Sequence, residues 1–131
     1  MARSPLKRAE TSLRGYALGF PEAVEEFPWG ERVIKVGGKI FVFLGEIEQR
    51  LRVGMKLPVS AEMALTLPFT EPTGYGLGRA GWVTARFGPG DDVPIDLLEE
   101  WIAQSYRAVA PKKLVKALDA VPPRPAKKKR P

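Results

Sequence analysis

The chain has 131 residues, 44% of them hydrophobic and 27% charged, with neither cysteine nor histidine. The absence of cysteine excludes disulfides and thiolate chemistry, and the absence of histidine removes the commonest metal ligand and the usual proton shuttle. No apolar run approaches the roughly 18 residues of a membrane span, so we expect a soluble, cytoplasmic protein. A chain of this length can bury a core without disulfides, and we expect one domain over residues 1–120.

The positive charge is concentrated in two places. The net charge is +6, but the last ten residues hold five basic side chains and no acid, which leaves +1 for residues 1–121. Residues 121–131, rich in proline and lysine, have the composition of a disordered basic tail. Residues 32–56 carry six cations against two acids. Attraction to polyanions is therefore expected from the tail and from this segment.

The first predicted element is a helix. Ser4 and Pro5 suit the N-cap and the first helical position, and apolar residues then recur at helical spacing to about Leu18. Residues 21–26 are compatible with one further helical turn.

Three consecutive strands are predicted next. Gly37-Gly38 joins residues 32–36 to residues 39–44 as a hairpin, because both central positions of a type I′ turn need positive φ. The third strand, which ends at Leu57, alternates between apolar residues and the cations Arg50, Arg52 and Lys56. A one-residue slip would bury these cations, so the register is well specified.

The remaining sequence alternates between helices, a loop and a strand. Residues 59–67 are predicted as a short helix capped at Ser60, residues 68–81 as a loop and residues 82–87 as a fourth strand. A longer helix begins at Pro94 or Ile95, and Pro111 interrupts it before a last helical segment.

Residues 76–81 match the dinucleotide-binding pattern G-x-G-x-x-G. That site needs its glycines between a buried strand and a helix N-terminus. Here a loop precedes the glycines and a strand-like run follows them, so we interpret them as loop glycines. No cofactor is expected.

Catalytic and metal-binding groups are equally hard to assemble. Adjacent acids such as Glu25-Glu26 and Asp91-Asp92 are interpreted as solvated surface. Ser105 and Tyr106 have no histidine to activate a serine nucleophile. We therefore expect neither an enzyme nor a metal site.

The basic strand residues raise a nucleic-acid hypothesis. Phe41 and Phe43 are expected to share one face of the strand next to the basic one. Cations interleaved with aromatic side chains on a sheet can hold phosphates and stack bases. The alternative is that the phenylalanines face the helices and the cations are only solvated.

The order of several short motifs resembles the MmcQ/YjbR-like family. These motifs are Phe27-Pro28-Trp29-Gly30, residues 35–41, Tyr75, Gly81-Trp82-Val83 and Ser105-Tyr106. The resemblance spans Leu6 to Leu118 and implies a CyaY-like α+β fold, an antiparallel sheet of about four to five strands with helices packed on one face. The resemblance also implies a DNA-binding role, which has been attached to this family on the basis of paired β-hairpin wings.

Our leading hypothesis is therefore a monomeric, noncatalytic DNA-binding protein with little sequence specificity, because phosphate contacts carry no sequence information. The expected phosphate contacts are Lys35, Lys39, Arg50, Arg52, Lys56 and, in the tail, Lys127, Lys128, Lys129 and Arg130. The alternative is a protein-interaction or small-ligand module with a pocket formed by Trp29, Tyr75, Trp82 and Tyr106.

Overall fold

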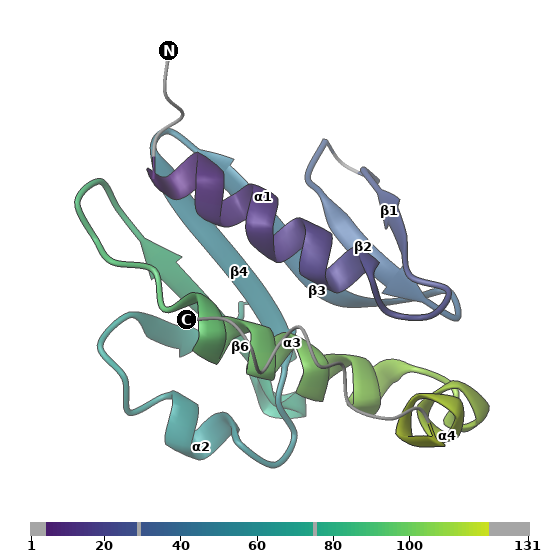
Figure 1. Cartoon of the computed structure of the whole chain (residues 1–131). Helices are drawn as coiled ribbons and strands as arrows, with labels where there is room; N and C mark the ends of the chain where they lie inside the picture. Colours follow the sequence, from purple (N-terminus) through teal and green to yellow (C-terminus); the bar gives the residue numbers. More distant parts are fainter. Residues whose placement is uncertain (1–4, 29, 75, 121–131) are drawn as a thin grey trace.

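The computed structural model describes residues 5–28, 30–74 and 76–120 (Figure 1). Its elements are α1 (Pro5–Leu18), β1 (Val24–Glu26), β2 (Val33–Val36), β3 (Lys39–Ile47), β4 (Arg50–Lys56), α2 (Ala61–Ala64), β5 (Thr70–Pro72), η1 (Leu77–Ala80), β6 (Trp82–Phe87), α3 (Ile95–Val109) and α4 (Lys112–Ala120). The strands form one antiparallel sheet in the order β1-β2-β3-β4-β6-β5. Helices α1 and α3 contact each other and cover the same face of this sheet (Figure 1). The predicted α+β fold with helices on one face is confirmed.

The core lies between this helical layer and the sheet. Every second residue of β4 faces the helices and pairs in register with a core residue of β6, giving Leu51 with Phe87, Val53 with Ala85 and Met55 with Val83. Their neighbours Arg50 and Arg52 point to the other side and are exposed. The predicted alternation of the third strand is confirmed, and a one-residue slip would bury its arginines.

Both hairpin turns of the central strands use the left-handed region. Gly37 and Gly38 have φ values of 60° and 81°, as predicted for a type I′ turn. The turn between β3 and β4 places Glu48 and Gln49 at φ values of 52° and 62°. Non-glycine residues in this region carry a steric cost.

The expectation that Phe41 and Phe43 share a face is wrong. Ile34 pairs with Val42 whereas Lys35 pairs with Ile40, so Phe41 is an extra residue on β3 and interrupts the alternation of side chains. Phe41 belongs to the core under the helices, and Phe43 packs against Trp82 on the opposite side of the sheet.

The two edge strands, β1 and β5, were not predicted. Residues 24–26 form a strand rather than a helical turn, because Glu22 adopts a φ of 61° and redirects the chain beside β2. Residues 70–72 pair with β6 inside the predicted loop. Both edges are only three residues long, as is common for strands that must not pair with another chain.

The predicted helices are present, but α2 covers only Ala61–Ala64 of the predicted residues 59–67, and Ser60 does not form the expected cap bond. This residue is the N-cap of α2, but its hydroxyl donates to Gln104 Oε1 at 2.8 Å instead of forming the expected cap bond. In the described part of the chain, each helix is too short or too polar to span a membrane.

Candidate nucleic-acid interface

One face of the sheet is left without covering helices. The strand register brings Arg52 opposite Arg86, Gly54 between Phe43 and Thr84, and Lys56 opposite Trp82. None of these residues belongs to the core under α1 and α3. We call this side the helix-free face.

Three hollows follow β4 across the helix-free face. The first, of about 560 Å³, is lined by Arg50, Arg52 and Arg86 together with residues after β6. The second, of about 530 Å³, shares Arg52 with the first and includes Phe43 and Gly54. The third, of about 510 Å³, shares Phe43 with the second and includes residues of the β2–β3 hairpin, Lys56 and Trp82. It reaches the end of the sheet, where Leu77 of η1 and the last residues of α3, Ala108 and Val109, also line it. The shared residues show that these hollows adjoin one another along β4, and we call the three together the β4 groove.

The cations of the β4 groove differ in how their charge is compensated. Arg86 forms an ion pair with Glu71 at 3.2 Å, and Lys35 forms one with Glu26 at 3.0 Å. Within residues 5–28, 30–74 and 76–120, by contrast, the cations of β4 itself form no ion pair with an acid: Arg50, Arg52 and Lys56.

The pairing of Arg52 with Arg86 adds to this excess of positive charge. Like charges directly opposite each other on neighbouring strands are unfavourable. The ion pair of Arg86 with Glu71 offsets part of this repulsion, and an anion bound beside Arg52 would lower it further. The acids that also line the groove are Glu31, Glu71, Asp91 and Asp92. They lie at its sides, in or next to the loops and the edge strand.

Arg86 was missing from the residues predicted to bind phosphate. The strand over residues 82–87 was predicted, and its alternation places Arg86 on the side of Thr84 and Trp82. The signal was therefore present in the strand itself, but its neighbour β4 could be identified only from the structure.

An aromatic pair lies in the middle of the groove. The ring centroids of Phe43 and Trp82 are 5.4 Å apart with an interplanar angle of 66°. Phe43 lies over Gly54, where a Cβ atom would approach its ring to 3.3 Å. Trp82 is 8% exposed, whereas Phe43 is half-buried and lines two of the hollows.

The cations on the helical side have acidic partners. Arg14 donates to Glu25 at 2.6 Å, and Arg32 donates to the same carboxylate at 2.7 Å and also to Glu10. Lys7 pairs with Glu46 at 3.2 Å. The hydrogen bond from Arg14, reinforced by Arg32, holds the pKa of Glu25 below its ordinary value. This network joins α1 to the first two strands.

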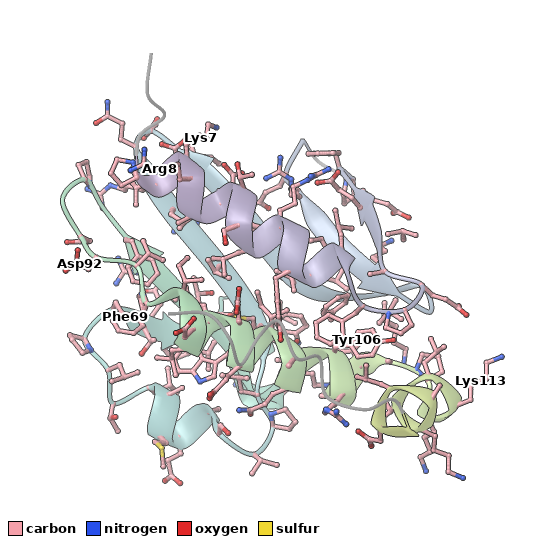
Figure 2. The ribbon with its side chains drawn as sticks, in the orientation of Figure 1. Lys7, Arg8, Phe69, Asp92, Tyr106 and Lys113 are labelled. Carbon is pink, nitrogen blue, oxygen red and sulfur yellow. The ribbon has the colours of Figure 1, made fainter. Side chains whose placement is uncertain are left out.

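The two aromatic residues of the predicted pocket that the structure describes, Trp82 and Tyr106, lie on different sides of the sheet. Trp82 lies on the helix-free face, whereas Tyr106 is fully buried on the helical side, between α3 and the segment after α1 (Figure 2). Its ring stacks on Phe20 at 4.6 Å, and its hydroxyl donates to the Pro21 carbonyl at 2.9 Å. Burial raises the pKa of Tyr106, and Glu22 adds to this shift. Trp29 and Tyr75, like residues 127–130 of the tail, lie outside the described residues.

Ser105 holds α3 against the sheet. Its hydroxyl donates to the Phe41 carbonyl at 2.6 Å and accepts the backbone N–H of Lys56 at 2.8 Å. The side chain is fully buried, so both hydrogen bonds are protected from water. This position couples β3, β4 and α3.

The glycines of residues 76–81 shape a tight loop, as predicted. Gly76 and Gly81 have φ values of 79° and 92°, and a Cβ atom on Gly78 would lie 2.9 Å from Pro72. The loop leads directly into β6 rather than into a helix. In the portion that the structure describes, no cluster of three or more acids could hold a metal ion.

An antiparallel sheet covered by helices on one face and open on the other defines a two-layer α+β sandwich. The YjbR family model matches residues 18–108, and the chain belongs to this family. It is also similar to the crystal structure of Deinococcus radiodurans protein DR2400, a DUF419 domain protein, with a TM-score of 0.65 and 28% identity over 86% of this chain and 88% of that one. No curated protein matches the sequence.

Proposed function

We propose that this protein binds DNA without catalysing a reaction, holding the phosphate backbone in the β4 groove and with its basic tail. The observation that carries the proposal is the set of cations on β4 without acidic partners in the described structure, Arg50, Arg52 and Lys56. Cations that neutralise phosphates release condensed counterions, which supplies affinity. The chain has no histidine or cysteine, and catalysis forms no part of the proposal.

The two hairpins supply the ends of this surface. Lys35 and Lys39 flank the β2–β3 turn and line the third hollow, and Arg50 begins β4 directly after the β3–β4 turn. Contacts of this kind position DNA but do not read its bases. We therefore expect weak sequence preference and steep salt dependence.

The test is a fluorescence anisotropy titration of duplex DNA at two salt concentrations, one low and one of about 0.15 M. At the higher concentration, interactions between charges more than about 8 Å apart are largely screened. R50A/R52A should bind about tenfold more weakly, since exposed ion pairs contribute up to about 1 kcal/mol each. The dependence of its binding constant on salt concentration should become shallower, by the amount expected for the loss of about two phosphate contacts. The matched control is K112A/K113A, which removes two exposed cations from α4 (Figure 2).

A tail variant separates the folded face from residues 121–131. In the full chain, the tail cations are replaced in K127Q/K128Q/K129Q/R130Q. We expect weaker binding that still depends on Arg50 and Arg52. Binding that disappears with the tail charges, or that R50A/R52A and K112A/K113A weaken equally, would contradict a site on the sheet.

The second candidate function is binding of a small anionic ligand. The third hollow, of about 510 Å³, combines Trp82 with Lys35 and Lys56, and its size falls within the range of small-molecule sites. A thermal-shift screen of aromatic carboxylates and nucleotides tests it. Stabilisation by one such compound without any affinity for DNA would favour this candidate over the first.

A further inference from the structure

Phe43 occupies a defined place between two cations. It lies directly opposite Gly54, and Arg52 and Lys56 are two residues away from Gly54 on either side, on the same face of β4. At the rise of an extended strand, each cation is about 7 Å along β4 from the position that Phe43 faces. A half-buried ring is thus centred between two positive charges without acidic partners in the described residues.

Two glycines lie next to this ring in the groove. Gly45 lies two residues from Phe43 on the same strand and opposite Arg52, and a Cβ atom there would meet nothing within 4 Å. Gly54 has no side chain either, and Phe43 lies over it. Trp82 supports the ring from the far side. Phe43 itself covers Gly54, so it is Gly45 that leaves room for a planar group beside the ring.

A nucleotide has the matching arrangement, a planar base with phosphates on both sides along its strand. Aromatic platforms flanked by cations are effective for unpaired bases, because every base has a π-face. In a duplex these faces are covered by neighbouring bases, and exposing them requires unstacking. Phe43 can therefore contribute binding energy only to a strand whose bases are unpaired.

We infer that the β4 groove accommodates single-stranded DNA, with one base stacked on Phe43 and the adjoining phosphates held by Arg52 and Lys56. This inference rests on the proposed DNA binding and specifies the form of DNA. Arg50 and Arg86 extend the phosphate contacts towards the beginning of β4. Oligothymidine is a suitable probe, because it forms no duplex with itself and its bases stay unpaired.

The experiment compares the full-length protein and two Phe43 variants on fluorescein-labelled oligothymidine and on a duplex of equal length. F43L keeps an apolar side chain over Gly54 but has no aromatic face, and F43Y keeps the aromatic face. Thermal unfolding of each variant shows whether the fold is retained. We expect F43L to weaken oligothymidine binding roughly tenfold, to leave duplex binding unchanged, and F43Y to bind like the parent protein.

The inference is overturned if F43L binds both DNA forms like the parent protein, or weakens both equally, while R50A/R52A still weakens binding. That result would leave phosphate binding by the sheet in place without a stacked base. If R50A/R52A has no effect on either DNA form, the proposed function itself fails, and the inference fails with it.

Discussion

The two faces of the sheet use their cations differently. On the helical side, Arg14 and Arg32 share the carboxylate of Glu25, and Lys7 reaches Glu46. On the helix-free face, Arg50, Arg52 and Lys56 form no ion pair within the described structure. The cations named on the helical side are thus neutralised, whereas those of β4 on the other side are uncompensated among the described residues.

This difference separates residues that stabilise the fold from residues available to a ligand. Pairing offsets the desolvation cost of a partly buried cation such as Arg32, which explains the network around Glu25. Arg50 and Arg52 are exposed and need no such partner, so their clustering is not required by folding. The Arg52–Arg86 juxtaposition opposes folding slightly, and this cost supports a role in binding an anion.

The largest expected difference between the faces is in the free energy of unfolding when either phenylalanine of β3 is truncated. F41A removes a fully buried ring whose centroid lies 5.3 Å from that of Tyr106. This change should lower the free energy of unfolding by about 3–5 kcal/mol. F43A removes a half-buried ring and should cost about 1–2 kcal/mol. Urea unfolding measures both losses of stability. Equal losses would contradict the placement of Phe41 in the core and of Phe43 on the opposite side of the sheet.

Ser105 tests how the helical layer is attached. S105A leaves the Phe41 carbonyl and the Lys56 N–H without this buried partner, and we expect a loss of about 1–3 kcal/mol. S60A, which removes a more exposed hydroxyl bonded to Gln104, is the control. A smaller loss for S105A than for S60A would show that the helix is held by other contacts.

Glu25 gives the helical side a pH dependence. Its folded pKa is lowered from the ordinary value of 4.5 by Arg14 and Arg32. The ionised form therefore contributes stability that is present above the unfolded pKa and lost as pH falls through the folded pKa. E25Q should lower the free energy of unfolding by about 1 kcal/mol at neutral pH, with little difference once the pH lies below the folded pKa of Glu25. Chemical denaturation at both pH values measures this, and a gap that persists in acid would contradict it.

The smallest effect is expected from relieving the arginine pair. R52Q should raise the free energy of unfolding by about 0.5 kcal/mol at low salt, and high salt should abolish the gain by screening. K112Q, on α4, is the matched control and should change stability by less. A loss of stability in R52Q would mean that Arg52 has a structural role.

Local patterns in the sequence predict much of this fold. The alternation from Arg50 to Leu57 and the Gly37-Gly38 turn depend on neighbouring residues, and the structure confirms both. The bulge at Phe41 could not be predicted. Residues 40–44 are all apolar, so they show no alternation of polar and apolar residues in which an extra residue would be visible. The short edge strands are equally hidden, since three residues carry too little pattern.

The candidate site was only partly predictable for a related reason. Arg50, Arg52 and Lys56 share a face through their own strand, so sequence alone groups them. Arg86 joins them only because β6 pairs with β4, a long-range contact. The predicted pocket placed Trp82 beside Tyr106. In the structure the sheet lies between them, and the sequence alone does not show on which side of a sheet each residue falls.

The most direct test of the central claim is an NMR titration of the full-length, isotope-labelled protein with oligothymidine. If the open face of the sheet binds DNA, the amide shifts will concentrate on the helix-free face, at Phe43, Gly54 and Thr84, and at Arg52 and Lys56. Residues of α1 that face the core, such as Leu13, should change little. Shifts confined to residues 122–131, or concentrated on the helices, would contradict the claim that the open face of the sheet binds DNA.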